Sequence, residues 1–192
     1  TAKTLHQRGW NVVIHYRSRE TEARDLMESL NQSRPASAVC KQGDLTQSRD
    51  VARLAEQACQ HWGRLDALVN NASVFYPNPT SEATEDDWQQ IMGANLKAPF
   101  FLLQHCLPAL RESKGGVINL IDIYSEKPLA DHPLYCASKA GLAALTRSWA
   151  KDLAPDIRVN GVSPGAILWP EGDQAVDPEH QQAILAKTPM AR

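Results

Sequence analysis

The sequence predicts a single α/β domain with a doubly wound, three-layer parallel sheet. Short apolar runs alternate with amphipathic segments of helical period along most of the 192 residues, a pattern that places helices on both faces of a parallel sheet. Hydrophobic residues make up 43% of the chain, enough for one sizeable core. Prolines such as Pro77 and Pro164 mark loops after strands, at the sheet edge where ligands bind.

The alternation can be followed in order along the chain. Runs of apolar residues predict strands at residues 11–15, 38–41, 67–70, 117–121 and 157–162. Amphipathic segments predict helices at residues 20–31, 47–61, 86–111, 135–153 and 178–187. Thr84 and Asp87 have the spacing of a capping box, with Asp in place of Glu. Strand and helix thus follow each other as in a Rossmann-type fold.

Charge and cysteine usage exclude several classes of function. The formal net charge is −2 and both signs are mixed along the chain, so no basic stripe is available for nucleic acid or an anionic membrane. The four cysteines form no C-x-x-C pair and have no metal-ligand spacing, which predicts reduced thiols and no metal site. Polar residues interrupt every long apolar stretch, and the N-terminus lacks the order of a secretion signal. We expect a cytoplasmic protein.

Tyr135 and Lys139 stand four residues apart at the start of an expected helix, so the phenol and the ammonium lie on one face. A phenol has a reference pKa near 10, and a nearby ammonium lowers that pKa towards the range useful for proton transfer. The pair alone also fits two exposed residues on a helix surface. Its context is more specific, because Asp122 ends one strand, residues 70–73 end another and Asn95 interrupts an apolar helix.

In order along nearly the whole chain, these residues resemble the short-chain dehydrogenase/reductase family. The matching motifs are N-N-A at 70–72, the helix residue Asn95, Y-x-x-x-K at 135–139 and R-V-N-G-V-S-P-G at 158–165. The resemblance implies hydride transfer in which Tyr135 gives a proton and Lys139 lowers the pKa of Tyr135 and holds the nicotinamide ribose. It implies that Asn95 anchors a water linking Lys139 to solvent. A helix-bending Asn is the alternative for Asn95. The resemblance also implies cofactor contacts from Asn71, Ala72, Pro164 and Gly165.

The end of the first visible strand predicts NADPH as the cofactor. An NAD enzyme typically places Asp or Glu there, whereas Arg accommodates a 2′-phosphate. The sequence has Arg17, Ser18 and Arg19 and no acidic residue, so we expect Arg17 and Ser18 to hold NADPH. Solvated residues before a helix are the alternative. Asp44, followed by Leu45, matches the family's adenine-contacting position, with a turn or cap role as the alternative.

Asp122 departs from the family, which usually has Ser thirteen residues before the Tyr. Pteridine reductases share this Asp, and the chain resembles them also at residues 15–18, 70–77 and 164–165. The resemblance implies that Phe75 stacks a pterin ring against the nicotinamide and that Ser73 contacts substrate or cofactor phosphate. It implies that Asp122 binds the pterin and assists protonation. The structural alternatives are loop packing for Phe75, a turn for Ser73 and a strand-end cap for Asp122.

We therefore expect residues 1–192 to form one dinucleotide-binding reductase domain that transfers hydride from NADPH to a pterin or folate substrate. A broad carbonyl or 3-oxoacyl reductase and a non-catalytic NADP-binding sensor are the alternatives. The chain opens inside an expected helix, residues 2–7, and contains no G-x-x-x-G-x-G turn. We expect the functional protein to carry a first strand with that turn and a C-terminal strand as well. The resemblance also implies a homo-tetramer, paired through helices 86–111 and 135–153.

Overall fold

The computed structural model describes residues 1–165, 182, 185 and 186 and has the expected α/β fold in a single domain. All strand pairs are parallel. The strands are β1 (Val12–Tyr16), β2 (Ala38–Gln42), β3 (Ala67–Asn70), β4 (Gly116–Leu120) and β5 (Arg158–Val162). Each lies within one or two residues of its predicted position.

Within the described residues, the strands form two sheets, β1–β2 and β3–β4–β5. β1 and β3 both line a cleft of about 1220 Å³ that separates the two sheets. The parallel, doubly wound arrangement is therefore present as two sheets of one domain on either side of this cleft. The presence of a further strand beyond these five stays a prediction.

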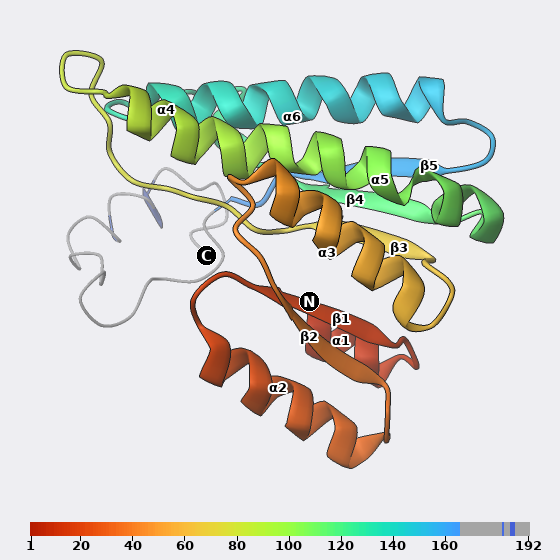
Figure 1. The fold of residues 1–192 in the computed structure, drawn as a ribbon. Coiled ribbons are helices and arrows are strands. Elements are labelled where there is room, and N and C mark those ends of the chain that lie inside the picture. The colour runs from red at the N-terminus through yellow and green to blue at the C-terminus, as the bar shows by residue number, and fades with distance from the viewer. Residues whose placement is uncertain (166–181, 183–184, 187–192) are drawn as a thin grey trace.

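The helices pack along these sheets (Figure 1), with α2 along β1 and β2, and α5 and α6 along β4. They are α1 (Ala2–Gln7), α2 (Glu20–Ser33), α3 (Ser48–His61), α4 (Glu85–Met92), α5 (Ala98–Ser113) and α6 (Pro133–Asp152), with a π-helical segment η1 (Gly93–Lys97) and a 3-10 turn η2 (Ile123–Ser125). The helix expected at 178–187 lies largely outside the described residues. None of the described helices is long and apolar enough to span a membrane.

The helix expected at 86–111 is present but divided, because η1 joins α4 to α5. The predicted capping box begins α4: Asp87 N donates to Thr84 Oγ1 at 3.1 Å, and Thr84 N donates to Asp87 Oδ2 at 2.8 Å. A π-helical turn carries one more residue than an α-helical turn, and such turns are frequent at functional sites. Asn95 lies in this segment.

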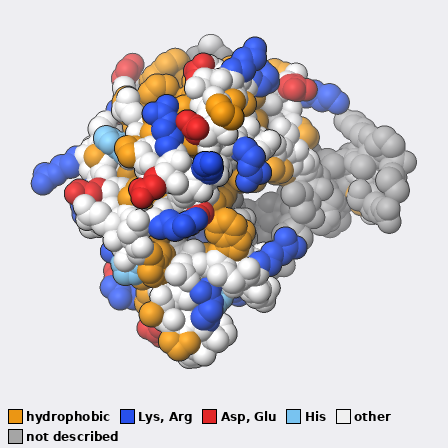
Figure 2. All heavy atoms as spheres, turned by 90° about the vertical axis from the view of Figure 1, so that its right-hand side faces the viewer, with side chains coloured by type: hydrophobic (Ala, Val, Ile, Leu, Met, Phe, Trp, Pro, Cys, Tyr) orange, Lys and Arg blue, Asp and Glu red, His pale blue; other side chains and the backbone are white. Residues whose placement is uncertain are grey.

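The main core lies where α3, α5 and α6 pack on the three-stranded sheet. Leu110 and Val117 are fully buried there, and Leu142 and Ile157 are almost so. On the face drawn in Figure 2, Lys and Arg side chains occur together with Asp, Glu and hydrophobic side chains. The core therefore fixes β4 and α6, the two elements that lead to Asp122 and Tyr135.

Candidate active site

Tyr135 and Asp122 are in direct contact. Asp122 follows β4 and begins η2, while Tyr135 lies in the first turn of α6. The Tyr135 hydroxyl donates to Asp122 Oδ2 at 2.6 Å, and Tyr124 N donates to Asp122 Oδ1 at 3.0 Å. One carboxylate oxygen thus caps the turn, and the other faces the phenol. Asp122 has both the capping role and the contact with Tyr135 that its position in the sequence allowed.

The pKa of Tyr135 is raised above its usual value. Burial is the largest cause, followed by the hydrogen bond to Asp122 and the negative charge of Asp122, while Ser73 acts in the opposite direction. A phenolate beside a carboxylate would suffer repulsion and lose a hydrogen bond, so the protonated phenol is favoured. These effects together favour the protonated form of Tyr135 at neutral pH.

Lys139 lies on the same face of α6 as Tyr135, and its ammonium reaches a backbone carbonyl. Its Nζ donates to the Leu120 carbonyl at 2.9 Å and lies 5.6 Å from the centre of the Tyr135 ring. Burial lowers the pKa of Lys139, and the charge of Asp122 opposes this effect. The lowering of the Tyr135 pKa by Lys139 stays a prediction from the resemblance. In this structure Asp122 accepts the phenolic hydrogen bond, whereas the ammonium lies over the ring.

Asn95 is almost completely buried, at 1% exposure. Its Oδ1 accepts from Val74 N at 2.7 Å and from Ser73 Oγ at 3.3 Å. Its Nδ2 donates to the Val74 carbonyl at 2.9 Å and to Ser138 Oγ at 3.2 Å. Asn95 thus joins the loop after β3 to α6. The anchoring of a water between Asn95 and Lys139 stays a prediction from the resemblance.

Phe75 presents its ring next to Tyr135. The two ring centres are 4.7 Å apart in an edge-on arrangement, and 54% of Phe75 is exposed. On another side, Phe75 stacks with His132 at 4.7 Å and an interplanar angle of 13°. Phe75 therefore packs against a neighbouring loop and still exposes about half of its surface. Sequence reasoning missed His132. Its position three residues before Tyr135, about one helical turn away, could have indicated that it lies near the same site.

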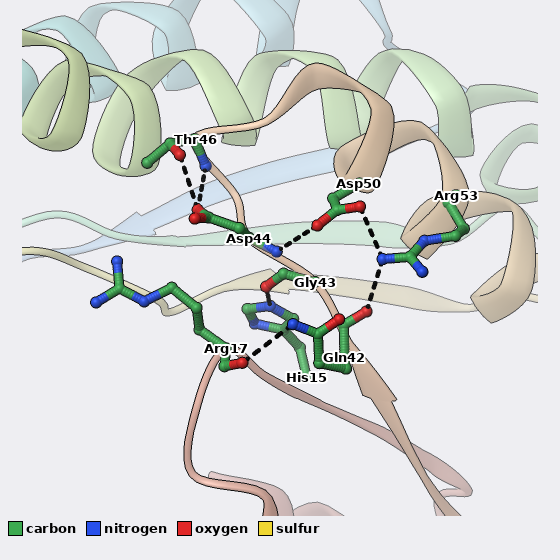
Figure 3. Close-up of polar contacts among 8 residues, drawn as sticks. All are labelled: His15, Arg17, Gln42, Gly43, Asp44, Thr46, Asp50 and Arg53. Carbon is green, nitrogen blue, oxygen red and sulfur yellow. Dashed lines mark hydrogen bonds and ion pairs between the residues drawn. The ribbon is translucent and has the colours of Figure 1, made fainter.

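The ends of β1 and β2 are tied together (Figure 3). His15 Nε2 donates to the Gly43 carbonyl at 2.9 Å, and Gln42 Nε2 donates to the Arg17 carbonyl at 3.1 Å. The Arg17 side chain extends away from Gln42 and Gly43 in Figure 3. Within the described residues, no ion pair engages its guanidinium. The backbone of Arg17 is therefore fixed while its charge remains available.

Asp44 takes part in the turn that follows β2. Its Oδ1 accepts from Thr46 N at 2.9 Å and from Thr46 Oγ1 at 2.8 Å, while Asp44 N donates to Asp50 Oδ2 at 2.9 Å (Figure 3). Burial raises the pKa of Asp44, but the two Thr46 hydrogen bonds and the charge of Arg17 lower it below its usual value. The turn role suggested by the sequence is therefore present, and Asp44 carries a negative charge near Arg17.

The predicted site residues fall into two groups. The first group lines the cleft between the sheets and comprises Arg17, Ser18, Asp44, Leu45, Asn71, Ala72 and Ser73. The second group is Asp122, Tyr135, Lys139 and Phe75, none of which lines that cleft. Pro164 lies beside this second group, because its carbonyl accepts from Ile123 N in η2 at 3.4 Å, and Gly165 follows it. Asn95 connects the two groups, because it accepts from Ser73 of the first group and donates to Ser138, which precedes Lys139 on α6.

Comparison with known proteins identifies the family of the chain. A family model described as enoyl-(acyl carrier protein) reductase matches residues 1–192. The chain therefore belongs to this family of short-chain dehydrogenases/reductases and is an oxidoreductase of that class.

Two kinds of relative are similar to the chain. Pteridine reductase 1 of Leishmania tarentolae is 33% identical to the chain over an alignment 209 residues long. The match covers 88% of this chain and 72% of that protein. The hydroxynaphthalene reductase-like protein Arp2 of Metarhizium guizhouense is 34% identical over 169 residues, 86% of this chain and 62% of that protein. The Arp2 protein of Metarhizium majus matches to the same extent. The chain thus spans about two thirds of the length of these relatives.

The contact between Tyr135 and Asp122 predicts a measurable change in phenol titration. Substituting Asp122→Asn removes the negative charge that disfavours the phenolate, so we expect the pKa of Tyr135 to fall. Carbon-13 NMR of labelled tyrosine follows this titration across the alkaline range. Tyr76 is an internal control, because burial and its hydrogen bond to Asp87 raise its pKa to about 12 independently of Asp122. An unchanged Tyr135 titration in the variant would contradict the electrostatic role of Asp122.

Proposed function

We propose that the chain is an NADPH-dependent reductase that transfers hydride to a pteridine of the dihydropteridine or dihydrofolate type. The observation that carries this proposal is the 2.6 Å hydrogen bond from Tyr135 to Asp122, beside the exposed ring of Phe75. A carboxylate accepts hydrogen bonds from the amino and ring N–H groups of a pterin, and an exposed aromatic ring stacks on a flat heterocycle. Similarity to a pteridine reductase supports the same choice.

The residues of the cleft fit NADP(H). Arg17 has a guanidinium without an ion-pair partner within the described residues, and such a group binds phosphate well. In our proposal Arg17 and Ser18 hold the 2′-phosphate, and Asp44 and Leu45 lie at the adenine. The rest of the cofactor site is formed by Asn71, Ala72, Tyr135, Lys139, Pro164 and Gly165. When bound, the nicotinamide supplies the hydride.

The proton-transfer role in our proposal belongs to Tyr135, with Asp122 beside it. Burial and Asp122 raise the pKa of Tyr135, so its phenol holds a proton that it can donate in the reducing direction. Asp122 binds substrate N–H groups and assists protonation. Lys139, whose Nζ already donates to the Leu120 carbonyl, provides the positive charge next to the phenol ring and holds the nicotinamide ribose. Ser73 contacts substrate or cofactor phosphate.

The second candidate is a reductase of aromatic or other ketones. The hydroxynaphthalene reductase-like relatives favour it, because a fused aromatic ketone would also stack on Phe75. A broad carbonyl or 3-oxoacyl reductase and a non-catalytic NADP-binding sensor also remain candidates. Steady-state rates with dihydrobiopterin, dihydromonapterin, dihydrofolate and a simple ketone separate these functions. Nucleotide binding without turnover of any of them would favour the sensor.

Tyr135→Phe tests the proton donor. Tyr135→Phe removes only the phenolic hydroxyl, so we expect turnover to fall about 10²–10⁴-fold, the usual contribution of general acid catalysis. The dissociation constant for NADPH should change little, as measured by fluorescence titration. Wild-type turnover in this variant would show that another group donates the proton.

Asp122→Ser tests the substrate. The substitution restores the usual family residue, so we expect dihydropteridine turnover to fall at least about tenfold while ketone reduction survives or rises. Both rates are measured on the same preparation with saturating NADPH. Equal losses for the two substrates would instead identify Asp122 as a structural residue and favour the second candidate.

Arg17→Ala tests the choice of cofactor. A hydrogen bond to a charged group contributes about 1.5–3 kcal/mol, so NADPH binding should weaken about ten- to a hundredfold while NADH binding is unaffected. The matched control is Arg24→Ala, which removes an exposed arginine paired with Glu20 on α2. If Arg17→Ala and Arg24→Ala leave the NADPH dissociation constant equally unchanged, Arg17 does not bind the phosphate.

We further propose that the protein forms a homo-tetramer through the α4–α5 and α6 surface. Trp88 and Phe100 are exposed there, at 48% and 38%, and border an apolar groove with Phe101 and Leu145. Burial of such a patch against a second copy is favourable, since large exposed apolar patches mark interaction sites. Multi-angle light scattering at micromolar concentration should give four chains per particle. A monomer would contradict the proposal.

A further inference from the structure

The backbone on both sides of Phe75 is held in place. Val74 is bonded through both its N–H and its carbonyl to the buried amide of Asn95, at 2.7 and 2.9 Å. On the other side, the Tyr76 hydroxyl donates to Asp87 Oδ1 at 2.8 Å, and Asp87 belongs to the capping box of α4. Phe75 is therefore held through the backbone of Val74 on one side and through the side chain of Tyr76 on the other.

His132 contacts the Phe75 ring. The two rings are nearly parallel, at 13°, with centres 4.7 Å apart. His132 Nδ1 lies 2.7 Å from the Ala130 carbonyl, and because a carbonyl only accepts, Nδ1 carries a hydrogen. The next residue along the loop, Asp131, has a left-handed φ of 58° and accepts at its carbonyl from Asn78 N at 2.7 Å. The imidazole is thus fixed by its own loop, and that loop is tied to the loop of Phe75.

We propose that His132 is a positioning residue that sets substrate specificity for planar rings. Its imidazole lies against one side of Phe75 and holds the Phe75 ring beside Tyr135, while 54% of Phe75 remains exposed for a flat substrate. This inference rests on the proposed function, in which Phe75 stacks a fused heterocycle. It predicts that His132 affects planar substrates and leaves small aliphatic ketones unaffected, because the latter have no ring to stack.

The test compares three variants by steady-state kinetics with dihydrobiopterin, a fused aromatic ketone, a small aliphatic ketone and NADPH. In His132→Ala we expect KM for the planar substrates to rise about two- to twelvefold, equivalent to the ~0.5–1.5 kcal/mol of an aromatic stack. The kcat should be unchanged. The KM for NADPH and the KM for the small ketone should be unchanged as well. His132→Phe keeps a ring but loses the Nδ1–H, so it should restore the planar-substrate KM. His105→Ala, an exposed histidine on α5, is the matched control.

An unchanged KM in His132→Ala would overturn the proposal. A KM in His132→Phe as high as in His132→Ala would overturn it too, since hydrogen bonding and not stacking would then matter. A wild-type protein that reduces neither planar substrate, nor dihydromonapterin or dihydrofolate, refutes the proposed function itself. In that case proton NMR still examines the contact: stacking shifts the His132 ring protons upfield, and Phe75→Leu should reverse the shift. Ring protons that do not respond to Phe75→Leu would show that His132 does not hold the Phe75 ring.

Discussion

The buried side-chain amide of Asn95 is the interaction on which the arrangement of the site depends. An amide that is taken out of water must have its hydrogen bonds satisfied, because a buried unpaired polar group costs about 1–3 kcal/mol. The amide of Asn95 is satisfied by the backbone of Val74 and by the side chains of Ser73 and Ser138. Since these partners belong to the loop after β3 and to α6, neither element can shift without breaking hydrogen bonds at 1% exposure. The positions of Phe75 and Tyr135 are thereby coupled.

The electrostatics of Tyr135 follow from the same burial. A phenol that is withdrawn from water and hydrogen-bonded to Asp122 has a raised pKa and keeps its proton at neutral pH. The protonated phenol is the form that can donate a proton during hydride transfer, but a raised pKa also makes it a weaker acid, because general acid catalysis is most efficient when the pKa lies near the operating pH. Burial lowers the pKa of Lys139, and the charge of Asp122 opposes it. Asp122 therefore acts in one direction on both neighbours: it favours the protonated phenol and the protonated amine.

The sequence predicted the local elements well because strand and helix periods are local properties. The five strands lie within one or two residues of their expected positions, and the capping box at Thr84 is present as the spacing indicated. The π-helical segment within 86–111 was not predicted, since one extra residue per turn scarcely alters an apolar pattern. The hydrogen bond from Lys139 Nζ to the Leu120 carbonyl could also not be predicted from the spacing of the residues. Helical spacing placed Lys139 on the face of Tyr135 but carried no information on which acceptor the ammonium would reach.

His132 shows a further limit of sequence reasoning, because its contact with Phe75 depends on a left-handed residue at Asp131 and on a loop more than fifty residues away. Two buried amides also join the carboxyl ends of β3 and β4 to α6. Asn70 Nδ2 donates to Asn119 Oδ1 at 2.8 Å, and Asn119 Nδ2 donates to Thr146 Oγ1 at 2.8 Å.

These bonds join β3, β4 and α6, the elements that lead to Phe75, Asp122 and Tyr135. The β1–β2 sheet instead carries Arg17 and is closed by its own contacts at Gln42 and Gly43. The proposed catalytic and cofactor-selecting residues are thus held by separate sets of hydrogen bonds. A change in one set can therefore alter cofactor preference without disturbing the contact between Tyr135 and Asp122.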